Sequence, residues 1–128
     1  MLKLQWAKEF EIGNEYVDIQ HRFFLDLINR IEKVFKESDD DAYKRRLWIE
    51  LYKYADFHFT SEENLAMAQG LAGIKNHHQL HAQLFEEVEQ FEKDLDSGSK
   101  TIDDLLEFIT DWFLVHTIHE DRKLFQAM

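Results

Sequence analysis

The 128-residue sequence contains no cysteine, no proline and only four glycines. The absence of cysteine excludes disulfides, thiolate metal sites and cysteine nucleophiles. The scarcity of proline and glycine leaves little material for β-turns and favours helices. Basic residues are also few, because 15 Lys and Arg stand against 26 Asp and Glu, and the net charge is −11. This balance argues against binding to nucleic acid or to an anionic membrane surface.

The sequence also lacks any run of about 18 apolar residues, and its first residues do not resemble a signal peptide. We therefore expect no membrane segment and a cytoplasmic location. The chain is nevertheless 45% hydrophobic and contains 11 Phe, which is enough for one core. We expect a single domain over residues 1–128, and a monomer.

Apolar residues recur every three or four positions in four long segments, as they do on one face of an α-helix. The four stripes run from Val17 to Phe35, from Leu47 to Leu65, from Ile74 to Leu95 and from Ile102 to His116. An acidic run at 37–41, the glycines at 70 and 73, and Ser97-Gly98-Ser99 separate them, and Thr101 and Asp104 have the spacing of a capping box. The predicted fold is all-α, an up-down-up-down antiparallel four-helix bundle with an N-terminal loop and a short C-terminal tail.

Polar side chains interrupt these apolar stripes at six positions: His21, His58, Glu62, His77, His81 and His116. One such histidine is commonly a core residue with a partner, but each unpaired buried polar group costs roughly 1–3 kcal/mol. A metal site would satisfy the whole set at once. His58 and Glu62 are four residues apart, as are His77 and His81, so each pair shares a helix face.

Asp121 follows His116 by five residues, which places it some 140° away on a regular helix. It reaches the same point only where the helix bends or loosens. Imidazole with carboxylate and no sulfur suits iron, zinc, copper or nickel. Seven ligands exceed the capacity of one ion, so we expect two ions with the carboxylates between them. With octahedral iron and one bridging hydroxide, a single position stays open, which suits a diatomic ligand.

These residues resemble the hemerythrin family, in particular the single-domain bacteriohemerythrins. The motifs are Trp6, Asp18-Ile19-Gln20-His21, His58-x-x-x-Glu62-Glu63, His77-x-x-x-His81 and His116-x-x-x-x-Asp121. The family uses an aspartate five residues after its last histidine, which supports Asp121. The resemblance implies a non-haem di-iron centre bridged by Glu62 and Asp121. It implies one iron held by His77, His81 and His116, and another, which binds O2, held by His21 and His58.

The chain departs from the family pattern at two places. Leu71-Ala72 stands where members commonly have Tyr-Pro, and we expect a looser loop there without loss of iron. Trp112-Phe113 stands where they tend to have Trp-Leu. We expect both residues to line the O2 pocket, and the larger Phe113 ring to alter O2 access or affinity. The remaining histidines, His78 and His119, are expected on the surface.

The expected function is reversible O2 binding, as a carrier, store or sensor, without enzymatic activity. The alternative is a di-iron oxidase or a peroxide-scavenging enzyme. Ferritin-like di-iron enzymes use mostly Glu, with Glu-x-x-His motifs. This chain instead offers five histidines on its stripes, with no spare acid for proton delivery, which favours binding over turnover.

Overall fold

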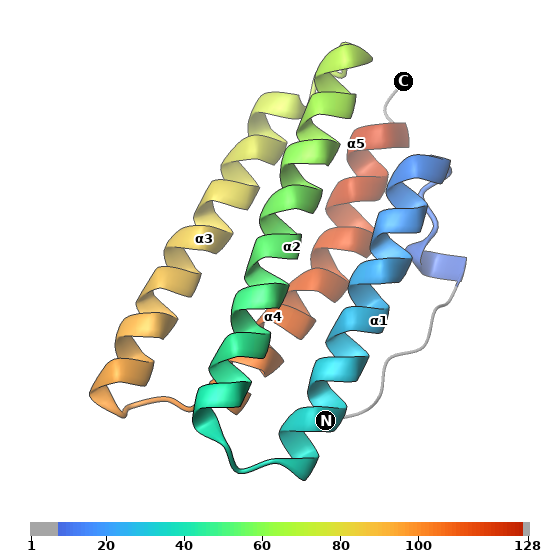
Figure 1. Cartoon of the computed structure of the whole chain (residues 1–128). Helices are drawn as coiled ribbons and strands as arrows, with labels where there is room; N and C mark the ends of the chain where they lie inside the picture. The colour runs from blue at the N-terminus through green and yellow to red at the C-terminus, as the bar shows by residue number, and fades with distance from the viewer. Residues whose placement is uncertain (1–7, 127–128) are drawn as a thin grey trace.

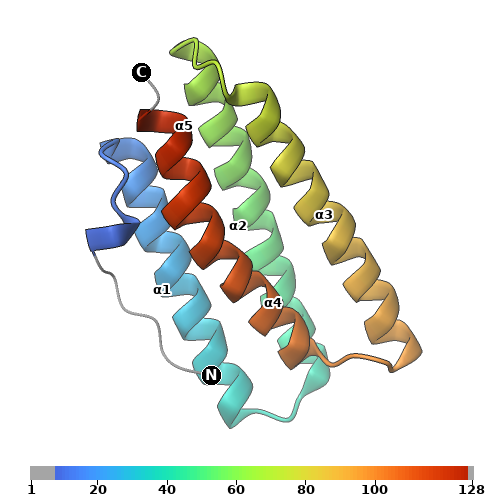
Figure 2. The same ribbon diagram turned by 180° about the vertical axis from the view of Figure 1, so that it is seen from behind.

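The computed structural model describes residues 8–126, apart from the side chains at 9, 114, 117, 118 and 126, so Trp6 lies outside the described residues. The long helices are α1 (Glu15–Glu37), α2 (Asp41–Ala68), α3 (Ile74–Ser97) and α4 (Ile102–Val115). They lie side by side and are joined by short connections (Figures 1 and 2). A 3-10 turn, η1 (Lys8–Phe10), precedes them. The predicted all-helical class is confirmed.

The helix ends carry the caps that the sequence indicates. Asp40, in the acidic run, accepts a hydrogen bond from the backbone N–H of Tyr43 at 3.2 Å and so begins α2. Thr101 and Asp104 form the predicted capping box, with bonds of 2.9 and 3.2 Å between each backbone N–H and the other's side chain. Gly98 ends α3 with a φ of 81°, a conformation that other residues rarely adopt.

Two groups of buried apolar side chains lie along the helices. The larger group, the main core, contains Leu and Ile residues of α1 and α4, together with Phe24, Leu51, Leu84 and Phe113. The smaller group, the end cluster, consists of Ile12, Val17, Ala66, Leu71, Leu124 and Phe125. On α2 the predicted stripe was slightly out of phase: Leu47 and Leu65 are only partly buried, whereas Trp48, Ala55 and Phe59 are buried.

The C-terminal part is helical where the sequence predicted a tail. Beyond α4 the chain continues through a π-helical segment, η2 (His116–Asp121), into α5 (Arg122–Gln126). Leu124 and Phe125 are buried in the end cluster, and Arg122 donates a hydrogen bond of 3.0 Å to the carbonyl of Glu11. These contacts hold residues 122–125 in the fold, so a tail directly after Asp121 was a wrong prediction. Leu71 joins the same cluster, whereas its neighbour Ala72 is exposed.

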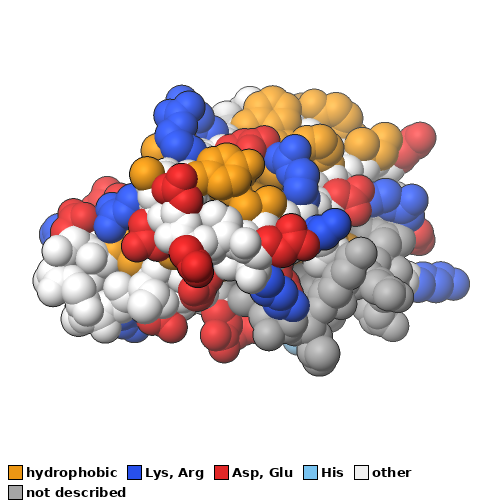
Figure 3. Space-filling model, turned by 60° about the horizontal axis from the view of Figure 1, so that its bottom comes forward, with side chains coloured by type: hydrophobic (Ala, Val, Ile, Leu, Met, Phe, Trp, Pro, Cys, Tyr) orange, Lys and Arg blue, Asp and Glu red, His pale blue; other side chains and the backbone are white. Residues whose placement is uncertain are grey.

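The surface mixes acidic and basic side chains around a group of hydrophobic ones (Figure 3). Among the side chains that the structure describes, the large hydrophobic ones that are exposed lie on α1 and α2, except for Val115. Those on α1 and α2 are Tyr16, Ile19, Phe23, Tyr43, Ile49, Phe57 and Met67. Between residues 8 and 126, no helix combines the length and apolar character that crossing a membrane requires.

Candidate metal centre

Seven buried side chains from α1, α2, α3 and η2 converge between the two apolar groups. They form two overlapping sets of possible ligands, in each of which the ligand atoms lie within 4.8 Å of one another. The first set, the five-residue half, is Glu62, His77, His81, His116 and Asp121. The second set, the four-residue half, is His21, His58, Glu62 and Asp121. The structure thus brings together all seven residues that the sequence singled out, and both carboxylates belong to both halves.

Glu62, on α2, directs one carboxylate oxygen to each half. Its Oε2 lies 3.4 Å from Nε2 of His58 and 3.7 Å from Nε2 of His21. Its Oε1 lies 2.5 Å from Nε2 of His77 and 3.5 Å from Nε2 of His81. A carboxylate in this position is placed to join two cations rather than to complete the shell of one.

Asp121 divides its oxygens in the same way. Its Oδ2 lies 2.9 Å from Nε2 of His21, in the four-residue half. Its Oδ1 lies 2.8 Å from Nε2 of His77 and 2.7 Å from Nε2 of His116, in the five-residue half. The two carboxylates therefore form parallel links between the halves.

The π-helical turn explains how Asp121 reaches the centre. A regular helix would direct it well away from His116, whereas a π-helix pairs residues i and i+5. The segment from His116 to Asp121 is π-helical over its six residues, so both side chains face the same point. The loosening that the five-residue spacing required is present.

The contacts at the centre fit a site that could hold metal. Nε2 of His116 lies 3.0 Å from Nε2 of His81 and 3.2 Å from Nε2 of His77, so three imidazole nitrogens point at one another. Both oxygens of Asp121 and Oε2 of Glu62 are buried, and the imidazole nitrogens beside them do not form hydrogen bonds of regular geometry with them. A cation would use these inward lone pairs, and the donor set of nitrogen and oxygen suits iron.

The electrostatics of the metal-free centre are set by the two carboxylates. Burial would lower the pKa of His21 and of His77, but the carboxylates of Asp121 and Glu62 close beside them outweigh it and raise these pKa values to about 9 and about 10. Burial lowers the pKa of His58 to about 4. Burial would raise the pKa of both carboxyls, yet their histidine neighbours hold each pKa well below its usual range. Protons on His21 and His77 thus occupy places that a metal would take.

Aromatic rings enclose the centre, and the two expected pocket residues lie on different halves. Trp112 stacks on His116 with ring centroids 4.2 Å apart. Phe113 meets His21 edge-on at 5.9 Å and stacks on Phe24 at 4.7 Å. Phe113 is therefore beside the half to which the resemblance assigns O2, whereas Trp112 packs behind the other half.

Sequence reasoning gave no role to two residues that contact the histidines from outside. Oε1 of Gln20 lies 2.8 Å from Nδ1 of His58, and Oε2 of Glu63 lies 2.9 Å from Nδ1 of His81. Both belong to the family motifs, and that membership was the only signal in the sequence. His78 and His119 are exposed, as expected, but His78 also contacts Glu63 through its Nδ1.

Comparison with known proteins identifies the family of the chain. The family model described as "Hemerythrin HHE cation binding domain" matches residues 12–128. A bacteriohemerythrin of Clostridium acetobutylicum is 31% identical over 92% of this chain and 95% of its own length. A bacteriohemerythrin of Stenotrophomonas maltophilia is 25% identical over 95% of this chain and 79% of its own length. A hemerythrin-like protein of Naegleria gruberi is 28% identical over 92% of this chain and 87% of its own length.

Helices arranged around a buried cluster of histidines and carboxylates define a helical cation-binding protein. The match over residues 12–128 and the relatives of similar length identify it further. The chain belongs to the hemerythrin family.

Proposed function

We propose that the chain binds O2 reversibly at a non-haem di-iron centre, and that it is an oxygen carrier, store or sensor rather than an enzyme. Seven residues would hold the two irons: His21, His58, Glu62, His77, His81, His116 and Asp121. When bound, the pair of irons would supply the two electrons that O2 takes up on binding. The fold that we propose for it is the antiparallel up-down-up-down bundle, as one domain and as a monomer.

The observation that carries this proposal is the division of each carboxylate between the halves. Glu62 and Asp121 each place one oxygen against histidines of the five-residue half and the other against histidines of the four-residue half. A mononuclear site has no use for such an arrangement, because one cation would face only one oxygen of each carboxylate. Two cations fit it.

The unequal number of histidines supports a binding role. Beside the shared carboxylates, the five-residue half contributes three histidines and the four-residue half contributes two. The second half therefore keeps room for one small external ligand. His21 and His58 in this half are buried, and Phe24 and Phe113 lie against them, so an apolar wall would exclude water there.

An absorption spectrum tests the proposal. The protein, expressed in iron-rich medium, should contain two irons per chain. After anaerobic reduction it should gain a ligand-to-iron charge-transfer band when air is admitted, and lose the band under argon, through several cycles. One iron per chain, or zinc alone, would contradict the di-iron centre. Stoichiometric release of hydrogen peroxide in the first cycle, with no return of the reduced state, would favour the oxidase instead.

A further inference from the structure

Two histidines of the centre are held from outside by side chains of different charge. His58, in the four-residue half, is held by Gln20, a neutral amide. His81, in the five-residue half, is held by Glu63, a carboxylate. Neither Gln20 nor Glu63 is among the seven residues that meet at the centre. The contrast in charge between them thus follows the division between the halves.

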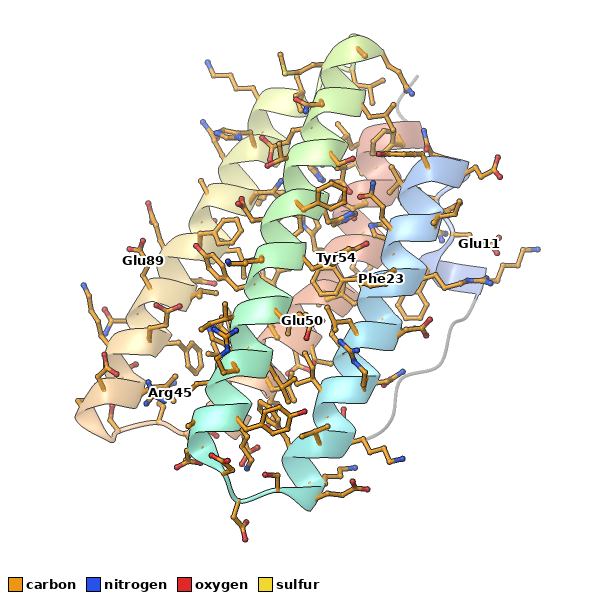
Figure 4. The ribbon with its side chains drawn as sticks, in the orientation of Figure 1. Glu11, Phe23, Arg45, Glu50, Tyr54 and Glu89 are labelled. Atoms are coloured by element: carbon orange, nitrogen blue, oxygen red, sulfur yellow. The ribbon has the colours of Figure 1, made fainter. Side chains whose placement is uncertain are left out.

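The Gln20 amide contacts one side chain through each of its two polar atoms. Its Nε2 donates a hydrogen bond of 3.0 Å to Oγ of Ser61, and its Oε1 faces Nδ1 of His58. Its backbone carbonyl accepts a bond of 2.9 Å from the hydroxyl of Tyr54, which lies beside Phe23 where α1 meets α2 (Figure 4). Nε2 of His58 faces Glu62 inside the centre, so when it presents its lone pair to a cation its Nδ1 carries the proton, and the amide oxygen of Gln20 is the group that accepts it.

Glu63 fixes His81 in the same sense but with a charge. Its carboxylate has no hydrogen to donate, so Nδ1 of His81 donates and Nε2 of His81 faces inward. The other oxygen of Glu63 contacts Nδ1 of His78. The side chain of Glu63 is 18% exposed and that of His78 is 66% exposed, so Glu63 lies between the surface and the centre.

A carboxylate that accepts the Nδ1 proton makes the imidazole a stronger donor at Nε2 than an amide does, because a charged hydrogen bond is stronger. We propose that Glu63 and Gln20 are positioning residues that make the two halves unequal: charged support behind the half with three histidines, neutral support behind the half with two. This inference rests on the proposed function, since it requires two irons in one chain. Its consequence is that Glu63 favours the ferric state in its half.

Exchange of the two supports tests this inference. In the full chain loaded with iron, Glu63→Gln keeps the shape and the acceptor but removes the charge. We expect the midpoint potential of the centre to rise and the affinity for Fe²⁺ to fall about 10-fold. Gln20→Glu adds a charge behind the other half and should lower the midpoint potential. Glu89→Gln, on an exposed position of α3, removes one charge away from the centre and should change neither quantity.

The outcomes separate this inference from the proposed function. If the wild type holds two irons and cycles with O2, but Glu63→Gln matches Glu89→Gln in potential and affinity, the inference is wrong and the function stands. If the wild type holds fewer than two irons, both fail together. Thermal unfolding of the metal-free variants shows whether Glu63→Gln folds. If it does not, Gln20→Glu decides, because an unchanged potential in that variant overturns the inference.

Discussion

The two halves of the centre differ in the way their histidines are packed. In the five-residue half, Phe59 stacks on His81 at 4.1 Å and Trp112 stacks on His116 at 4.2 Å, both nearly parallel. In the four-residue half, Phe113 meets His21 edge-on at 5.9 Å and Phe24 meets His58 edge-on at 6.0 Å, and the parallel ring of Tyr54 is 6.4 Å from His58. A parallel ring covers the whole face of an imidazole, whereas an edge-on ring covers only part of it.

This contrast indicates that the two halves of the centre meet different structural requirements. The five-residue half has three histidines, two stacked rings and a charged outer support, so its geometry is firmly determined. The four-residue half has two histidines, two edge-on rings, a more distant parallel ring and a neutral support. A site that has to hold metal permanently and also admit a ligand benefits from such a difference, because rigid ligands and an accessible position are separate requirements.

The largest effect on the metal centre is expected from removing a residue that both halves share. Glu62→Ala deletes an oxygen from each half and leaves a buried hole among imidazoles, so we expect loss of the paired centre rather than weaker binding. His78→Ala is the matched control, because it removes an exposed histidine that contacts Glu63 and is not among the seven residues of the centre. It should retain two irons and the spectrum of the O2-treated protein. Metal analysis and absorption spectra compare the two variants, and equal behaviour would show that the ligand assignment is wrong.

The pH dependence of the affinity for Fe²⁺ provides a second test of the two halves. In the metal-free chain each half holds one proton that a metal must displace, since the pKa of His21 is raised to about 9 and that of His77 to about 10, whereas His58 is already neutral. Between pH 7 and 8.5 the affinity for each Fe²⁺ should therefore rise by about 10-fold per pH unit, and the overall constant for binding two Fe²⁺ by about 100-fold, the slope for two protons. Competition with a chelator under anaerobic conditions measures it, and a slope near zero would contradict the assignment.

The same protons stabilise the metal-free fold, so its stability falls with rising pH whereas the affinity for Fe²⁺ rises. A raised pKa in the folded state stabilises the fold fully below the unfolded value of 6.5, and the contribution is lost as the pH rises through 9 to 10. The free energy of unfolding of the metal-free protein should thus fall above neutral pH. Iron should remove this dependence, because the bound protein no longer carries these protons.

The sequence predicts the helices well because their apolar stripes are long and their caps are specific. Every residue in the stripe on α1 from Val17 to Phe35 is buried, and the capping box at Thr101 is present. The buried face of α2 is predicted less accurately, because aromatic residues such as Tyr54 and Phe57 occur on several faces of this helix. Periodicity alone therefore predicts a buried face that is slightly rotated from the observed one. The end cluster was missed because Ile12 and Leu71 come from connections that have no period.

The residues of the candidate site also fall into those that periodicity predicts and those that it does not. Six of its residues stand on stripes, where a polar side chain is conspicuous. Asp121 does not, because its position depends on the π-helical turn that begins at His116, and periodicity assumes a regular helix. Only the family motif supported it. Gln20 and Glu63 lie beside the stripes, where polar residues are ordinary, so their contacts with the histidines emerge only from the packing of helices.

The smallest expected effect concerns Phe113, which lies against the half with fewer ligands. Its ring is buried, stacks on Phe24 and meets His21 edge-on, so a smaller side chain would open space beside that imidazole. Phe113→Leu should destabilise the fold by roughly 1 kcal/mol, the usual scale for a modest change in a core. It should also speed the entry and escape of O2 and hasten autoxidation, because water would reach the centre more easily.

Trp112→Phe is the matched control for this last prediction, since it trims a ring behind His116 in the other half. It should cost similar stability without a comparable change in O2 kinetics. Stopped-flow measurements of O2 binding, the autoxidation rate in air and thermal unfolding of both variants provide the comparison. If Phe113→Leu changes stability alone, the ring only fills volume, and the difference between the halves lies in their ligands and not in the wall beside them.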